Sequence, residues 1–262
     1  PRSGEGAVGR RPNQSTGNYW ITLYDTLAEA GLEVCLVNAR HVKGVPGRKT
    51  DVQDAVWLQQ LHAAGLLRKS FRPAPQIVPL RYLMRHRADL VAQAAQQVHL
   101  MQKSLTEMNL KLQSVFSDLD GQSAQAIIDA ILAGERDPAR LAALRDRRCK
   151  AEVEDIHQAL RGDYRAEYLF VLRQSQATWR HLQSAIGECD AEIAVLSARV
   201  SCAAPGPLPA APARQRQLRK NHPQYALWQE AWRFYGVDLS AVDGVSAGLV
   251  SVLMSEVGTR EQ

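Results

Sequence analysis

The stretch Met84–Val115, MRHRADLVAQAAQQVHLMQKSLTEMNLKLQSV, decides the fold of this chain. Nine of ten positions spaced alternately three and four residues apart are apolar, and Arg87 is the exception. This spacing places the positions on one side of a long helix and is typical of a coiled-coil seam. The positions are Met84, Arg87, Val91, Ala94, Val98, Met101, Leu105, Met108, Leu112 and Val115. We expect Arg87 to set the register of the seam by pairing with an acidic residue.

A second stretch with helical apolar spacing follows between Leu169 and Val200. Between the two stretches, residues 121–150 predict short helices broken at Gly134 and Pro138. The simplest arrangement is a helical hairpin. A second copy of the chain could complete it, so we also predict a homodimer or higher oligomer through the coiled coil.

The N-terminal part of the chain predicts an alternation of helix and strand. Apolar spacing indicates a helix over Tyr19–Ala30 that stops at Gly31. The run Glu33–Asn38 (EVCLVN) is the best strand candidate in the chain. Thr50–Gln53 has the form of a capping box, and the helix that it opens should run to Gly65. These elements predict an α/β region within the first 75 residues.

The C-terminal part begins after a Pro/Ala-rich linker, SCAAPGPLPAAPA, over residues 201–213. A basic patch at residues 214–220 and a helix with Trp228 and Trp232 follow. Residues 242–246 (VDGVS) precede an apolar helix to Val257 and resemble half of a helix-hairpin-helix, although a plain helix start also explains them. We expect five segments: an out-of-place or disordered N-terminus (1–13), an α/β domain (14–75), a helical coiled coil (76–200), a linker with a basic patch (201–220) and the start of a small helical domain (221–262).

Composition excludes several classes of protein. Apolar residues make up 45% of the 262 residues and charged residues 23%, which is typical of globular domains. No apolar run approaches the length of a bilayer span, and no leader peptide opens the chain, so we predict neither a membrane nor a secreted protein. The net charge of +5 permits a polyanionic partner. Four scattered cysteines predict neither a disulfide frame nor a zinc site.

Asp51 and Asp54 lie three residues apart at the start of a predicted helix, so both carboxylates belong to one face of it. Close carboxylates repel each other unless a divalent cation neutralises them, and oxygen ligands favour Mg²⁺ or Mn²⁺. Such sites support phosphodiester chemistry. A second explanation remains open, because acidic residues in a first helical turn also complement the helix dipole without a metal.

Basic residues surround the two carboxylates in the sequence and are our candidate nucleic-acid contacts. They are Arg40, Lys43, Arg48, Lys49, Arg68 and Arg72. Charged side chains on a solvated loop would explain them equally well.

Three runs in this region closely resemble the bacterial transposases of insertion-sequence family one-ten, the DEDD transposases. The runs are Ser15–Trp20 (STGNYW), Val37–Lys43 (VNARHVK) and Pro46–Ala55 (PGRKTDVQDA). The similarity continues through the coiled coil into Gly236–Leu239 and covers residues 14–262, and Lys49–Ala55 is its most specific part.

The resemblance implies an RNase H-like domain of the RuvC type with four metal-binding acids, a coiled-coil dimerisation region and a C-terminal domain that bears a serine nucleophile. Asp51 and Asp54 match the last two acids, and Gln14 stands at the Glu position of the family. The first Asp and the serine have no counterpart in the sequence. We therefore expect a copy truncated at both ends and inactive by itself, with Gln14 lending an amide oxygen but no charge to the metal.

The predicted function is DNA transposition by metal-dependent strand cleavage and transfer, with Mg²⁺ or Mn²⁺ as cofactor and Asp51 and Asp54 as catalytic and metal-binding residues. DNA is the expected partner, an RNA encoded by the element is a further one, and the expected location is the cytoplasm, at the nucleoid. The alternative is a non-catalytic coiled-coil protein that dimerises and binds nucleic acid.

Overall fold

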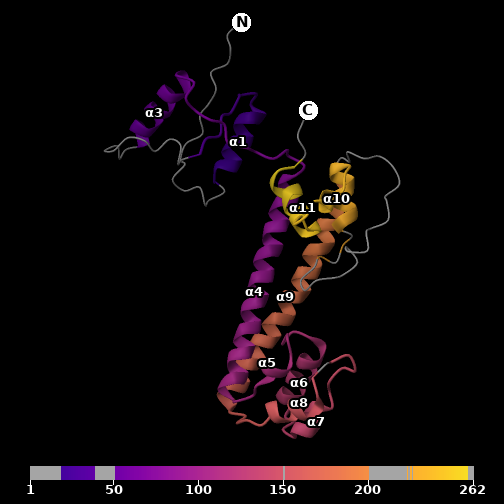
Figure 1. The fold of residues 1–262 in the computed structure, drawn as a ribbon. Helices are drawn as coiled ribbons and strands as arrows, with labels where there is room; N and C mark the ends of the chain where they lie inside the picture. The colour runs from indigo at the N-terminus through magenta and orange to yellow at the C-terminus, as the bar shows by residue number, and fades with distance from the viewer. Residues whose placement is uncertain are drawn as a thin grey trace. The chain divides into compact units, whose positions relative to one another are not determined.

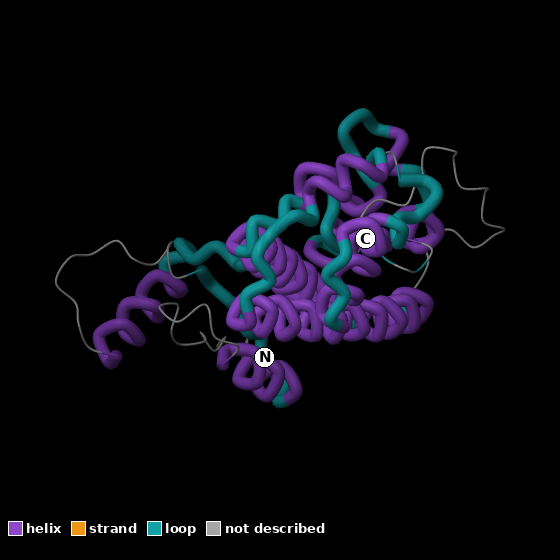
Figure 2. The backbone as a smooth tube through the Cα atoms, turned by 90° about the horizontal axis from the view of Figure 1, so that it is seen from below, coloured by secondary structure: helices purple, strands orange, loops and turns teal. Residues whose placement is uncertain are grey.

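The computed structural model describes residues 19–38, 51–149, 151–200, 223, 225 and 227–258 (Figure 1). Of residues 19, 51–54 and 247 it describes the backbone only. The chain divides into two compact units, residues 1–73 and residues 74–262. Helices and loops make up the described part of both units, and the described ranges contain no named strand (Figure 2).

The described part of the first unit contains two helices, α1 (Tyr19–Glu29) and α3 (Asp51–Ala63). Both helices are followed by a glycine with positive φ, Gly31 at +77° and Gly65 at +67°. Glycine adopts this left-handed conformation without the steric cost that a Cβ atom brings, and it ends a helix there. Both predicted helices and both predicted stops are therefore confirmed. The predicted capping box cannot be compared, because Thr50 lies outside the described residues.

The strand predicted over Glu33–Asn38 is reduced to an extended segment. Val37 makes one isolated antiparallel bridge with Lys69, and the backbone N–H of Ser70 donates to the carbonyl of Leu36 at 2.7 Å. The β-branched residues favour an extended chain, and Cys35 is a second bridge residue, but among residues 19–38 and 51–73 no strand ladder forms. The α/β prediction for residues 14–75 is thus not confirmed by the part of the unit that the structure describes.

The second unit is built on a hairpin of two long helices, α4 (Val78–Glu107) and α9 (Ala166–Arg199), which run side by side (Figure 1). The start of α4 pairs with the end of α9, so the helices are antiparallel. Both predicted apolar seams face each other, and buried residues from the start to the middle of α4 and from the middle to the end of α9 form one cluster. It contains Leu80, Leu90, Ala94, Leu182, Ile186, Cys189 and Ile193. The predicted hairpin is present, and it uses both seams within one chain.

The prediction of one continuous helix as far as Val115 is wrong. Helix α4 ends at Glu107, and Asn109 adopts a left-handed conformation with φ +56°. Asparagine tolerates this conformation better than most residues, and a right-handed helix cannot pass through it. The last two positions of the predicted seam lie on a separate short helix, α5 (Leu112–Val115).

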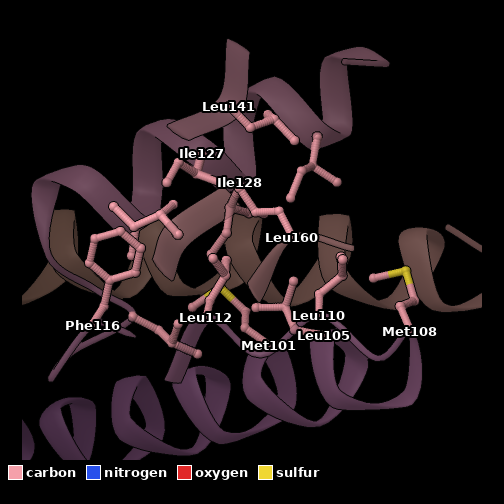
Figure 3. Close-up of a cluster of buried hydrophobic side chains, with 14 of the residues drawn as sticks. Met101, Leu105, Met108, Leu110, Leu112, Phe116, Ile127, Ile128, Leu141 and Leu160 are labelled. Atoms are coloured by element: carbon pink, nitrogen blue, oxygen red, sulfur yellow. The ribbon is translucent and has the colours of Figure 1, made fainter. Parts of the chain in front are cut away.

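The tip of the hairpin, where α4 ends and α9 begins, carries three further short helices. They are α6 (Gln122–Ala133), α7 (Pro138–Ala142) and α8 (Val153–Ala159). Their apolar faces pack on the end of α4, and Met101, Leu105, Ile128 and Leu160 are fully buried in this cluster (Figure 3). The predicted breaks are confirmed, since Gly134 has φ +104° and Pro138 begins α7.

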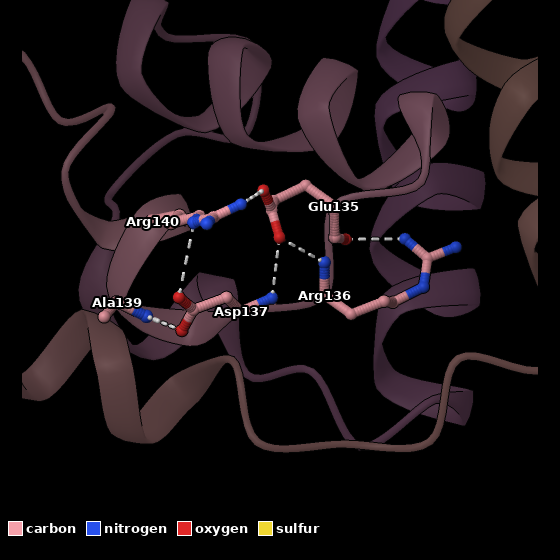
Figure 4. Close-up of polar contacts among 5 residues, drawn as sticks. All are labelled: Glu135, Arg136, Asp137, Ala139 and Arg140. Carbon is pink, nitrogen blue, oxygen red and sulfur yellow. Dashed lines mark hydrogen bonds and ion pairs between the residues drawn. The ribbon is translucent and has the colours of Figure 1, made fainter.

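Polar contacts fix the loop between α6 and α7 (Figure 4). The Glu135 carboxylate accepts hydrogen bonds from the backbone N–H groups of Arg136 and Asp137, both at 2.9 Å, and these bonds lower its pKa. The Asp137 carboxylate accepts from the N–H of Ala139 at 3.0 Å and caps α7. Arg140 lies 3.4 Å from Glu135 and joins the two carboxylates.

The C-terminal segment contains α10 (Leu227–Tyr235), the 3₁₀ helix η3 (Leu239–Ala241) and α11 (Ala247–Glu256). Ser246 caps α11 by accepting from the N–H of Leu249 at 3.2 Å. The segment packs on the base of the hairpin, where α4 begins and α9 ends, through a small apolar cluster. Its buried members are Ile77, Val200, Ala231, Phe234, Val250 and Met254. In the described ranges, every helix is too short or too polar to cross a membrane.

Candidate metal and nucleic-acid site

Asp51 and Asp54 occupy the first turn of α3. Positions three residues apart lie on the same side of a helix, as the sequence predicts for these two. The N-terminus of a helix carries a partial positive charge, which favours carboxylates there and opposes a bound cation. Their side chains lie outside the described residues, so the metal-ligand assignment stays a prediction.

Two carboxylates on one helical turn fit one Mg²⁺ or Mn²⁺ ion in chemical type, because both metals prefer oxygen ligands. They fill a minority of an octahedral shell, and water and substrate phosphate oxygens can supply further ligands. Among the side chains that the structure describes, no group of three or more His, Cys, Asp and Glu residues could hold a metal ion. The further ligand that the sequence predicts, Gln14, lies outside the described residues.

Of the six predicted nucleic-acid contacts, only Arg68 and Arg72 are described. Arg40, Lys43, Arg48 and Lys49 lie outside the described residues. Arg68 is exposed and makes no ion pair with any described side chain. This leaves its guanidinium available to a phosphate as far as the described residues are concerned.

Arg72 is held inside the first unit. Its guanidinium forms an ion pair with the Asp25 carboxylate and lies 3.9 Å from the centre of the Tyr24 ring, and 22% of its side chain is exposed. Burial lowers the pKa of Arg72, but hydrogen bonds to Asp25 and Tyr24 outweigh burial and raise the pKa overall. These contacts tie the end of the first unit to α1.

Lys69 is likewise paired, with Glu33 at 2.6 Å. The hydrogen bond and the charge of Lys69 lower the pKa of Glu33. Both side chains are largely exposed, so the pair contributes little to stability. Together with Arg72, this shows that part of the basic charge near α3 is neutralised within the unit.

The pairing of Arg72 with Asp25 escaped prediction because 47 residues separate the two. The available signal was weak. Asp25 is the only acidic residue among the first ten of the predicted helix, and a charged residue on a short apolar helix often has a partner.

The comparison with protein families gives one match. Residues 12–110 match the model of the DEDD transposases of IS110-type insertion sequences, which is described as a transposase. No curated protein and no solved structure matches the chain. The matched region contains residues 12–73 of the first unit, including Asp51 and Asp54, and α4. Over residues 12–110, the chain is therefore similar to the DEDD transposases of IS110-type insertion sequences.

Proposed function

We propose that this chain acts in DNA transposition and that Asp51 and Asp54 hold a divalent metal ion for the cleavage and transfer of DNA strands. The family match over residues 12–110 carries the proposal. The first turn of α3 supports it, because it puts the two aspartates on one side of one helix. An RNase H-like arrangement of residues 14–75 is part of the same proposal.

Each residue of the proposed site has a separate task. Asp51 and Asp54 provide the negative charge and the oxygen ligands that a divalent ion needs. A bound Mg²⁺ ion would polarise a phosphoryl oxygen and lower the pKa of an attacking water. The exposed guanidinium of Arg68, with Arg40, Lys43, Arg48 and Lys49, would hold the DNA backbone by its phosphates. Arg72 would act indirectly, by fixing the segment after Arg68 to α1.

Gln14 at the Glu position of the family predicts weak metal binding. An amide oxygen can coordinate a cation but does not offset its charge, whereas a carboxylate does both. We expect Gln14→Glu to tighten Mn²⁺ binding about tenfold or more. The added negative charge near the ion should contribute more than about 1.4 kcal/mol of attraction, which corresponds to a factor of ten in affinity.

Titration with Mg²⁺ and Mn²⁺ in a calorimeter, together with nicking of supercoiled plasmid DNA, tests the proposal. Asp51→Asn and Asp54→Asn should each abolish the heat of metal binding while DNA binding survives. Nicking by the natural chain should be weak or absent, since Gln14 replaces one family acid and the first Asp has no counterpart, and any nicking should be lost in both variants. Asp89→Asn is the matched control, because Asp89 is an exposed aspartate of α4 in the same family region. Loss of metal binding in the control, or its survival in both site variants, would indicate the non-catalytic alternative.

Self-association and an RNA partner are further parts of the proposal. The hairpin already buries its two seams against each other, so a homodimer would have to use the outer faces of α4 and α9. Light scattering on the full chain measures the oligomeric state. A monomer at all concentrations would exclude the dimer.

A further inference from the structure

The base of the hairpin contains a cluster of three charged residues that the proposed function does not use. Arg81 and Arg85 lie one turn apart on α4, and both contact the carboxylate of Glu256 in the last turn of α11. Arg85 binds it with two hydrogen bonds, Nε to Oε1 at 2.7 Å and Nη2 to Oε2 at 2.8 Å. Arg81 Nη2 lies 2.8 Å from Oε2. Two arginines therefore converge on one carboxylate, and the trio has a net charge of +1.

The geometry is that of an anion site. A guanidinium presents its N–H donors in a planar fork that matches phosphate as well as carboxylate oxygens. The carboxylate offers only two oxygens, and the buried Arg81 Nε has no hydrogen-bond partner in the described structure. A phosphate group offers more acceptor oxygens and a diffuse charge, so it could use the donor that Glu256 leaves unpaired.

The trio lies at the rim of the contact between α11 and α4. The side chain of Arg85 is 60% exposed, and those of Arg81 and Glu256 are 27% and 29% exposed. The apolar contact beneath it contains six buried residues, against sixteen in the cluster at the tip of the hairpin. A small apolar contact and solvent-accessible ion pairs make this docking the easier of the two to break.

The outer face of α11 also indicates that the docked position does not use the whole helix. Leu249, Val252, Leu253 and Val257 are 36–53% exposed, and Val250 and Met254 face the hairpin. The docked position therefore leaves part of the apolar surface of α11 in water, which weakens the hydrophobic preference for it.

We infer that Glu256 occupies an anion site formed by Arg81 and Arg85, and that the phosphodiester backbone of a nucleic acid takes its place when α11 leaves the hairpin. Glu256 then acts as an autoinhibitory contact, and α11 is released as the nucleic acid binds. The inference rests on the proposed function only for its choice of nucleic acid as the ligand. It involves neither Asp51 nor Asp54.

Binding of a fluorescent duplex by the full chain tests the inference, measured by anisotropy in EDTA so that no metal site contributes. Glu256→Gln keeps the shape of the side chain and removes the competing charge, and we expect it to tighten binding about tenfold. Glu230→Gln is the matched control, because it removes the same charge from the same segment, where Glu230 pairs with Arg233 at 2.9 Å. The control should change the affinity by less than about twofold, because Glu230 lies outside the proposed site and pairs with Arg233 instead.

The double variant Arg81→Gln/Arg85→Gln removes the site itself. It should lower the slope of log affinity against log salt by about one to two. Adding Glu256→Gln to it should give no gain in affinity. Equal gains from Glu256→Gln and Glu230→Gln, or an unchanged salt slope in the double variant, would overturn the inference. The affinity should be measured for duplex DNA and for duplex RNA of the same sequence. The duplex that binds more tightly identifies the source of the phosphates.

Hydrogen exchange supplies a readout that charge alone does not change. Saturating nucleic acid should accelerate exchange of the α11 amides in the natural chain, and α11 of Glu256→Gln should exchange fast without it. Unchanged protection of α11 on binding would contradict the inference. Glu256→Asp covers the case in which the glutamine variant aggregates, because its shorter carboxylate keeps the charge and should give an intermediate affinity. If the metal-binding test fails and the tests of Glu256 succeed, only the proposed metal-dependent catalysis is contradicted.

Discussion

At the scale of single residues, the ion pair between Arg87 and Asp190 is the main polar feature of the hairpin core. Arg87 Nε lies 2.5 Å from Asp190 Oδ1, and Nη2 lies 3.3 Å from Oδ2. The side chains are 12% and 2% exposed. Burial raises the pKa of the neighbouring Tyr225 and Cys189, and the charge of Asp190 raises both further. The aspartate is therefore a buried negative charge that depends on Arg87.

Replacing one member of this pair should lower the free energy of unfolding far more than replacing both with apolar residues. Arg87→Met leaves Asp190 buried without its guanidinium, and we expect a loss of about 3–5 kcal/mol in the free energy of unfolding. Arg87→Met/Asp190→Leu should restore most of it, because an apolar pair of similar volume fits the seam. Urea unfolding followed by circular dichroism measures both. Arg173→Met, at an exposed arginine of α9, is the control and should stay within about 0.5 kcal/mol. Equal losses in the single and double variants would contradict this account.

The seam pattern predicted that Arg87 would need an acid but could not say which one. The partner follows from the register of α4 against α9, and the 58 residues between the helices set that register. The same limit applies to the candidate site. The start of α3 was predictable from the capping-box form of Thr50–Gln53, and the common face of Asp51 and Asp54 from their spacing. The pairing of Arg72 with Asp25 depends instead on tertiary packing.

At the scale of elements, the turn after α4 shows where a periodic pattern stops being informative. Apolar spacing continues into α5, but the left-handed Asn109 separates the two helices. Two backbone hydrogen bonds join this turn to the last residue of α8 and to the chain that follows it. The N–H of Lys111 donates to the carbonyl of Ala159, and the N–H of Asp163 donates to the carbonyl of Met108, both at 2.8 Å. These bonds hold the turn after α4 against the end of α8, and the periodic spacing of apolar residues does not predict them.

Gly162 lies where the segment after α8 packs closely against the turn after α4. A Cβ atom added there would lie 2.3 Å from the carbonyl oxygen of Met108 and 2.7 Å from Leu110 Cδ2. Backbone cannot move aside cheaply, so Gly162→Ala should destabilise the hairpin by about 1–3 kcal/mol. Gly248→Ala on α11 is the matched control, because the nearest atom would be Ser246 Oγ at 3.7 Å. It should be neutral or stabilising by up to about 1 kcal/mol. Thermal unfolding of both variants tests this, and the account fails if Gly162→Ala is tolerated.

At the scale of the whole molecule, the two ends of the second unit differ in their expected stability against local unfolding. The tip has a large apolar cluster with fully buried side chains, and the base combines a smaller cluster with partly exposed ion pairs. Local unfolding should therefore begin at the base, with α11. The sequence predicted a C-terminal helical segment beyond a linker but not its docking on α4, because Ile77 and Met254 are distant in the chain.

Acid should release α11 before it unfolds the tip. Hydrogen bonds from Arg85, followed by the charges of both arginines, hold the pKa of Glu256 below its usual value of 4.5. A carboxyl with a lowered pKa stabilises the docked state fully above pH 4.5, and this contribution is lost as the pH falls through the lowered value. Protection factors of the α11 amides should therefore fall as the pH drops below 4.5, while those of α6 stay high. Carboxyls elsewhere titrate in the same range, so the comparison with Glu256→Gln is decisive. In that variant the α11 amides should already be weakly protected at pH 6, and their protection factors should change little on acidification. A fall in protection as steep as in the natural chain would assign the release of α11 to other carboxyls.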